Sequence, residues 1–142
     1  MAPPGHELIV GMRRDPQFGP LLMAGLGGIY VELLKDVAFR VAPFSRAETL
    51  VMLDETHAGK LLTGLRGQPP ADIEAVAEVI ERVAQIALDH PQIQEIDVNP
   101  LLVYPLNRQA GVVYPAGQGA LAVDVRMVLG AQAGQSPGSA PE

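Results

Sequence analysis

Short apolar runs separated by clusters of glycine and proline are the feature that most constrains the fold of this chain. Glycine occurs 15 times and proline 13 times among 142 residues, which is about a fifth of the chain, against roughly 12% in average composition. Some of this excess lies in the terminal segments, and the rest lies between apolar runs. The distribution therefore predicts many sharply specified turns between short elements.

The length and composition exclude several classes of protein. A chain of 142 residues forms one core rather than two. With 10 basic and 16 acidic side chains the net charge is −6, which argues against binding a nucleic-acid backbone, and 4% aromatic residues argue against base stacking. The absence of cysteine excludes disulfides and thiolate zinc sites. No apolar run reaches 18 residues and the first residues do not resemble a signal peptide, so we expect a cytoplasmic protein without a membrane span.

The first part of the chain predicts β structure. Residues 7–13 form an apolar run typical of a strand with a buried centre, and residues 15–20 carry proline and glycine at turn positions. A second short apolar run at 21–24 follows, so a hairpin is expected. Residues 37–42 alternate and end at a proline, which predicts another strand, whereas residues 29–34 fit a short helix or a strand equally well.

Two helices are predicted in the middle of the chain. Ser45 and Glu48 form a capping box, in which the serine hydroxyl accepts from the Glu48 amide, so a helix is expected over residues 46–56. Residues 61–70 look irregular and glycine-rich. Residues 72–88 give the clearest helix, because their apolar side chains recur at spacings of three, four and seven: Ile73, Val76, Ala77, Ile80, Val83, Ala84 and Ala87.

The last part of the chain predicts two strands, over residues 95–104 with an interruption at Asn99–Pro100, and over residues 121–129. Strands combined with two amphipathic helices predict an α/β or α+β domain with a mixed or antiparallel sheet packed against two or more helices. We expect residues 6–129 to form this domain, with a disordered N-terminus at 1–5 and a disordered tail at 130–142, where no large apolar side chain occurs.

Polar side chains inside these last two strands suggest a metal site. Asp97 and Asn99 share one face of the first strand. If the two strands pair antiparallel, their apolar runs align when paired positions sum to 223, and Asn99 then lies opposite Asp124. Two carboxylates and an amide oxygen suit Mg²⁺, which prefers oxygen ligands. The alternative is that Asp97 and Asn99 are turn residues before Pro100 and that Asp124 is an exposed strand position.

Several segments resemble a known family. The segment E-I-D-V-N-P-L-L-V at 95–103 and A-V-D-V-R at 122–126 resemble the end of the ATP-grasp domain in ADP-forming acyl-CoA synthetases, where succinyl-CoA synthetase β-subunits have E-I-N-P-L and L-D-x-K segments. The acetate–CoA ligase branch is more similar, through G-M-R-R-D-P-Q-F-G-P at 11–20, G-L-G-G-I-Y-V-E-L-L-K-D-V at 25–37 and L-L-T-G-L-R-G at 61–67.

This resemblance implies particular site residues. Asn99 and Asp124 correspond to magnesium ligands beside the phosphates of ATP or ADP, and Asp97 is a third, less well matched position. Candidate contacts to nucleotide or phosphate are Arg13, Arg14, Gly27, Gly28, Glu32 and Arg66. The arginines and glycines have structural alternatives, because the arginines also suit a solvated strand end or a loop cap, and the glycines also suit a tight turn. Glu32 is a candidate by motif match only.

The resemblance also implies a function and partners. The family couples acyl-CoA, ADP and phosphate to carboxylic acid, ATP and CoA through a phosphohistidine, with Mg²⁺ and ATP/ADP as cofactors. The similarity covers only the C-terminal part of the ATP-grasp domain, so the expected partners are its N-terminal half and the CoA-binding and phosphohistidine domains. We therefore expect the chain to be inactive alone and capable of self-association through apolar surface left exposed. The alternative function is a non-catalytic binding or interaction module.

Overall fold

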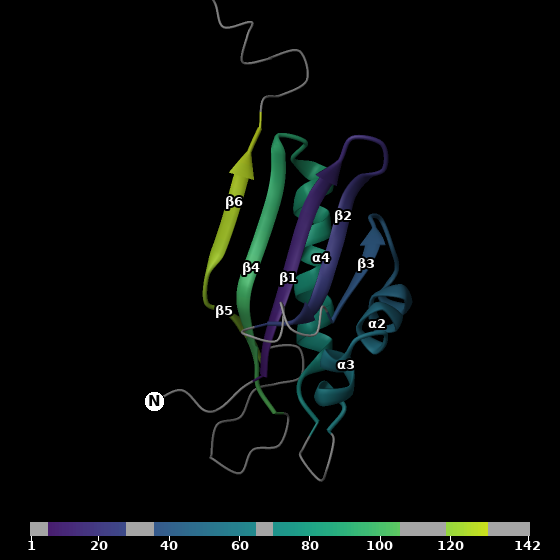
Figure 1. Cartoon of the computed structure of the whole chain (residues 1–142), viewed down its shortest axis with the longest axis vertical. Coiled ribbons are helices and arrows are strands. Elements are labelled where there is room, and N and C mark those ends of the chain that lie inside the picture. The colour runs from purple at the N-terminus through teal and green to yellow at the C-terminus, as the bar shows by residue number, and fades with distance from the viewer. Residues whose placement is uncertain (1–5, 28–35, 65–69, 106–118, 131–142) are drawn as a thin grey trace, which may run out of the picture.

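The computed structural model of the chain describes residues 6–27, 36–64, 70–105 and 119–130. Within them six strands form one antiparallel sheet and three helices pack against it, so the predicted α+β class is confirmed (Figure 1). The strand order is β3-β2-β1-β4-β5, with β6 also paired to β4. The elements are β1 (His6–Asp15), β2 (Gly19–Leu26), β3 (Val37–Val41), α2 (Arg46–Asp54), α3 (His57–Leu62), α4 (Ile73–Asp89), β4 (Ile93–Val103), β5 (Ala120–Ala122) and β6 (Val125–Leu129).

Strands β1 and β2 form the predicted hairpin. Their pairing runs without a shift from Leu8 opposite Leu26 to Asp15 opposite Gly19. The Asp15 carboxylate accepts hydrogen bonds from the backbone N–H groups of Gln17 and Phe18, at 2.8 and 2.9 Å, and so closes the turn. The hairpin is thus specified by turn chemistry close in the sequence.

The predicted register of the last strands is also confirmed, but the interruption lies in a different strand. Leu102 pairs with Leu121 and Asp97 with Arg126, so both pairs sum to 223. Strand β4 continues through Asn99–Pro100, whereas its partner breaks at residues 123–124 into β5 and β6. Between Val98 and Leu101, β4 has one residue more than β1 opposite, which is a β-bulge.

The helices differ from the prediction in the segment between α2 and α4. Ser45 caps α2 by accepting from the Glu48 amide at 3.2 Å, as expected, but α2 ends at Asp54. A further helix, α3, occupies part of the segment predicted to be irregular. Its N-terminus is capped by Thr56, whose hydroxyl accepts from Gly59, and by the Asp36 carboxylate. Helix α4 matches the prediction within one residue and is capped by Asp72.

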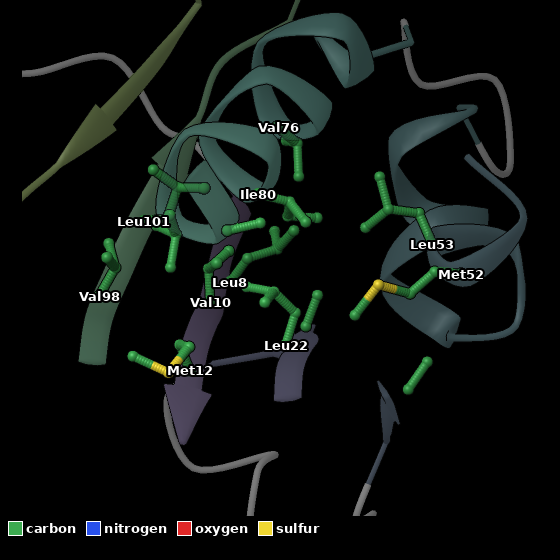
Figure 2. Close-up of a cluster of buried hydrophobic side chains, with 14 of the residues drawn as sticks. Leu8, Val10, Met12, Leu22, Met52, Leu53, Val76, Ile80, Val98 and Leu101 are labelled. Carbon is green, nitrogen blue, oxygen red and sulfur yellow. The ribbon is translucent and has the colours of Figure 1, made fainter. Parts of the chain in front are cut away.

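The hydrophobic core lies between one face of the sheet and the helices. Figure 2 shows Leu8, Val10 and Met12 of β1 pointing toward Val76 and Ile80 of α4, with Met52 and Leu53 of α2 closing the side of the cluster. These strand residues alternate along β1, which places every second side chain against the helices. In the part of the chain that the structure describes, all three helices contribute to this face.

Some sequence predictions lie outside the described residues: the terminal segments 1–5 and 131–142, the ambiguous run at 29–34 and much of the glycine-rich stretch at 65–69. Among the helices that are described, none is long and apolar enough to cross a membrane.

Candidate functional site

The face of the sheet that points away from the described helices carries a shallow groove of about 450 Å³. One wall is apolar and comes from β2 and β3, whereas the other is charged and comes from β4 and β6. Gly11 of β1 lies between them, where the missing side chain leaves room. The residues that line the groove on this face include Gly11, Arg13, Leu21, Met23, Phe39, Glu95, Asp97, Arg126 and Val128.

Arg13 lies at one end of this groove, paired across the sheet with Glu95. The guanidinium Nη2 is 3.0 Å from a Glu95 carboxylate oxygen, and Nε donates to the same oxygen at 3.1 Å. The Arg13 side chain is 79% exposed, so this ion pair contributes little to stability. Arg13 therefore keeps N–H donors free to meet an anion in the groove.

Arg14, the next residue and the other candidate for a phosphate contact, points to the opposite side of the sheet. Its guanidinium donates to the carbonyl oxygens of Ala87, His90 and Ile93, at 2.6, 3.2 and 2.9 Å. These carbonyls lie at the end of α4 and in the turn that follows, where the helix leaves its last carbonyls without partners. Arg14 thus closes the C-terminal end of α4 and does not join Arg13 in the groove.

Asn99 and Asp124 meet where β4 passes the break between β5 and β6. The Asn99 N–H donates to the Asp124 carbonyl at 3.1 Å, and the Val123 N–H donates to the Pro100 carbonyl at 3.1 Å. The two residues are therefore direct neighbours across the sheet, as the register predicted. Asp97 lies two residues earlier on β4, opposite Arg126. Asp97 lines the groove, whereas Asn99 and Asp124 lie just beyond its end.

The donor set at this point fits a magnesium ion. Asp97, Asn99 and Asp124 are all exposed, and within the described residues their side chains have no hydrogen bond or ion pair. In the same residues no three His, Cys, Asp or Glu side chains gather as a metal cluster, so protein ligands here amount to one amide and at most two carboxylates. Mg²⁺ typically takes few protein oxygens and keeps water or phosphate on its other positions.

The glycine-rich motif has a structural explanation in its first half. A side chain on Gly25 would put its Cβ 2.0 Å from the Asp36 carbonyl oxygen, and one on Gly27 would lie 3.1 Å from the Leu8 backbone. The Gly27 N–H already donates to the Glu7 carbonyl at 2.8 Å. These two glycines permit close backbone packing, so the phosphate contact expected of Gly27 has no free amide. Gly28, Glu32 and Arg66 lie outside the described residues.

Several groove residues were not predicted as site residues from the sequence. Met23 and Phe39 form the apolar wall because β3 pairs with β2 in the same sheet as the charged strands β4 and β6. Local sequence does not determine a strand order of this kind. Arg126 had a local signal, since it shares a face with Asp124 two residues away. Glu95 was part of a matched segment, but its pairing with Arg13 became visible only in the register of β1 and β4.

An antiparallel sheet with helices on one face, and on the other an open groove with one apolar and one charged wall, defines an α+β domain. Residues 1–129 match the family described as ATP-grasp domain, and the chain belongs to that family. It is 50% identical over 129 residues to subunit beta of an ADP-forming acetate–CoA ligase I from Pyrococcus furiosus, a match covering 91% of this chain and 50% of that subunit.

Other relatives agree. The ADP-forming acetate–CoA ligase I of Archaeoglobus fulgidus is 51% identical over 126 residues, covering 89% of this chain and 17% of that protein. Among solved structures, dinucleotide forming acetyl-coenzyme A synthetase 1 of Ca. Korarchaeum cryptofilum, in complex with coenzyme A and Mg-AMPPCP, aligns with a TM-score of 0.77 and 46% identity over 91% of this chain and 55% of that chain. The chain spans about half, or less, of the relatives it matches.

Proposed function

We propose that this chain provides the magnesium–nucleotide side of phosphoryl transfer in an ADP-forming acyl-CoA synthetase. The observation that supports the proposal most directly is the pairing of Asn99 with Asp124 across the sheet, on a strand whose next polar residue, Asp97, opens into the groove. The relatives are ADP-forming acid–CoA ligases, and the Korarchaeum enzyme binds Mg-AMPPCP. We also propose that the chain acts together with the other parts of such an enzyme.

Each site residue has a role in this proposal. Asn99 and Asp124 hold Mg²⁺ by their side-chain oxygens, with Asp97 as a further carboxylate. When bound, the ion neutralises phosphate charge, which phosphoryl transfer needs more than covalent chemistry from the protein. Arg13 lies at the far end of the groove from Asn99 and offers a planar set of N–H donors to a phosphoryl group. The apolar wall formed by Met23 and Phe39 excludes water from one side of that group.

The partners in this proposal are the missing half of the ATP-grasp domain and the CoA-binding and phosphohistidine parts of the synthetase. The relatives contain enough additional chain for such parts, because the match occupies only half of the Pyrococcus subunit and 17% of the Archaeoglobus protein. A nucleotide held from one side only loses much of its contact area, so MgADP should bind the isolated chain weakly, if at all. Titration calorimetry of the 142-residue chain with MgADP measures this.

A chimaera tests the proposed function directly. Residues 1–129 replace the matching segment of the Pyrococcus furiosus subunit beta, and the chimaera is assayed with the rest of that ligase for CoA-dependent ATP formation from acetyl-CoA, ADP and phosphate. We expect activity, and a loss of at least about 100-fold in Asp124→Asn, because the charge that holds the ion is removed. Asp54→Asn, an exposed carboxylate at the end of α2, is the matched control.

Three results would contradict parts of the proposal. A folded chimaera that assembles but forms no ATP would support a non-catalytic module instead. Equal activity in Asp124→Asn and the control would remove Asp124 from the site. Tight binding of MgADP by the isolated chain, abolished in Asp124→Ala, would show that the chain needs no partner to form the nucleotide site.

A further inference from the structure

Strand β6 lies at an open edge of the sheet and also exposes apolar side chains, a combination that proteins usually avoid. It is the outer neighbour of β4, with no further strand beside it in the described residues, and it presents an apolar row on the helix side of the sheet. Val125 and Met127 are each 47% exposed and Leu129 is 68% exposed. Edge strands are normally protected by proline, lysine or inward-pointing charge, but the sequence of β6 is V-R-M-V-L.

The exposed row continues the hydrophobic core. Val125 lies opposite Val98 and Met127 opposite Ile96, and directly opposed residues point to the same face. Val98 and Ile96 are 3% and 2% exposed, respectively, beneath the helices. The core layer therefore extends sideways onto β6, where no described element covers it. A contiguous apolar strip of this kind at the edge of a sheet marks an interaction surface.

The backbone of β6 is also available for pairing. The carbonyl of Asp124 accepts from Asn99 on β4, and the N–H of Gly130 donates to the Gln92 carbonyl at 2.8 Å. Because N–H and C=O directions alternate along an antiparallel strand, the even-numbered residues bond to β4. The backbone groups of Val125, Met127 and Leu129 then point outward, away from the sheet.

We infer that β6 is the interface with a second copy of this chain, paired antiparallel about a two-fold axis through Met127. In this register Met127 lies opposite Met127 of the second copy, and Val125 lies opposite Leu129. All outward-pointing residues then form hydrogen-bonded pairs, and the two apolar rows meet on the helix side. A two-fold interface of this kind uses the same surface on both copies, and it lies in the plane of the sheet, on the edge of β6 that faces away from β4.

The charges on the other face are complementary in this register. Arg126 lies beside Asp97 of its own β4, and Val128 lies beside Glu95. Across the two-fold axis Arg126 lies opposite Val128 of the second copy, whose neighbour is Glu95 of that copy. Each arginine is therefore placed between carboxylates of the two copies, and no two like charges are directly opposed, which would disfavour pairing. The pattern favours a second copy over an unrelated strand.

Sedimentation equilibrium of the 142-residue chain tests the dimer, which should have twice the 15.0 kDa mass of one chain. Met127→Lys places two ammonium groups opposite each other and should raise the dissociation constant of the dimer more than about tenfold. Val51→Lys is the matched control, since Val51 is 55% exposed on α2, far from β6 in sequence. Circular dichroism checks that both variants remain folded.

Disulfide trapping tests the register, because the chain has no cysteine of its own. Met127→Cys places two thiols across a hydrogen-bonded pair, about 5.5 Å apart at Cα, within reach of a disulfide under mild oxidation. Leu129→Cys places its two thiols about 13 Å apart along the strands, so it should not cross-link. A monomer at all concentrations, no effect of Met127→Lys, or equal cross-linking of the two cysteine variants would each overturn the proposal.

Discussion

The two faces of the sheet are built by the same strands and serve opposite purposes. On the face toward the helices, Leu8, Val10 and Leu22 are fully buried. On the other face, Gly11 and Arg13 of β1 lie beside Asp97 of β4 in an open groove. The alternation of side chains along a strand makes this division possible, so one strand carries both the stability of the domain and its candidate site.

Adjacent arginines show how sharp the division is. Arg13 is 79% exposed and pairs with Glu95 on the groove face, whereas Arg14 donates to three carbonyls at the end of α4. The same residue type at neighbouring positions therefore meets two environments. A matched motif therefore does not fix a role by residue type alone, because the direction of the side chain decides which partners are in reach.

The largest expected effect of a substitution is in the buried face. Ile80→Ala removes a fully buried side chain of α4 from the core, and should lower the free energy of unfolding by about 2–5 kcal/mol through lost burial and the cavity left behind. Phe39→Ala, on the groove face and 49% exposed, should cost less than about 1.5 kcal/mol. Chemical denaturation of both variants measures the difference, and equal losses would contradict the division into two faces.

Alanine substitutions at two glycines on the open face should lower stability by different amounts. Gly25→Ala places a Cβ 2.0 Å from a backbone oxygen of Asp36, so β2 and the chain before β3 must separate, at a cost of about 1–3 kcal/mol. Gly11→Ala meets only the flexible end of Met23 at 3.3 Å and a carbonyl at 3.5 Å, so its loss should be smaller. Thermal unfolding followed by circular dichroism compares them, and a lower melting temperature for Gly11→Ala would reverse the assignment.

The arginine pair gives the third test. Arg14→Ala leaves the carbonyls of Ala87 and Ile93 without their guanidinium partner, which should cost about 1–2 kcal/mol of unfolding free energy. Arg13→Ala removes only an exposed ion pair and should cost about 0–1 kcal/mol. In the synthetase chimaera, with activities compared at equal concentrations of folded protein, Arg13→Ala should lose more activity than Arg14→Ala. An Arg14→Ala variant that unfolds no earlier than Arg13→Ala would show that the cap is dispensable.

Much of this fold could be predicted because its signals are local or periodic. The stripe of α4, the turn chemistry of the first hairpin and the alignment of apolar runs at a sum of 223 all needed only residue spacing, and all three are confirmed. Helix α3 was missed because six residues are too few to show a period. The break at residues 123–124 was placed in the wrong strand because Pro100 was the visible irregularity.

The candidate site was predictable only where one strand pair builds it. Asn99 and Asp124 come from the pair whose register the sequence could specify, and Arg13 falls on the same face as the groove. Met23 and Phe39 depend on which strands are neighbours, a long-range property that local sequence does not contain. Arg14 did carry a signal, because it continues the even-numbered row of Leu8, Val10 and Met12, but the unbroken apolar run around Ile9 concealed the alternation.

The smallest expected effect concerns His6, which lies at the other end of this even-numbered row of β1. Partial burial lowers the pKa of His6 below its ordinary value of 6.5, since desolvation disfavours the charged imidazole. The unfolded chain then binds more protons than the folded chain as the pH falls below about 6.5, so the free energy of unfolding should decrease on acidification. Between pH 7.5 and 5.5 we expect a decrease of less than about 1 kcal/mol from this group, and His6→Gln should flatten the profile in that range.

A carboxylate that lies outside the even-numbered row of β1 separates the effect of His6 from general acid unfolding. The hydrogen bond from Arg40 lowers the pKa of Glu55 below its ordinary value of 4.5, so its contribution is complete above that pH and is lost only as the pH falls further. Glu55→Gln should therefore lower the free energy of unfolding by a constant amount near neutrality, without changing the slope of the profile there, and should flatten the profile below about pH 4.5. Urea unfolding at a series of pH values distinguishes the two groups. A His6→Gln profile that still falls as steeply between pH 7.5 and 5.5 would mean that the helix-covered face carries no titrating group at its margin, and that the acid sensitivity of the domain arises elsewhere.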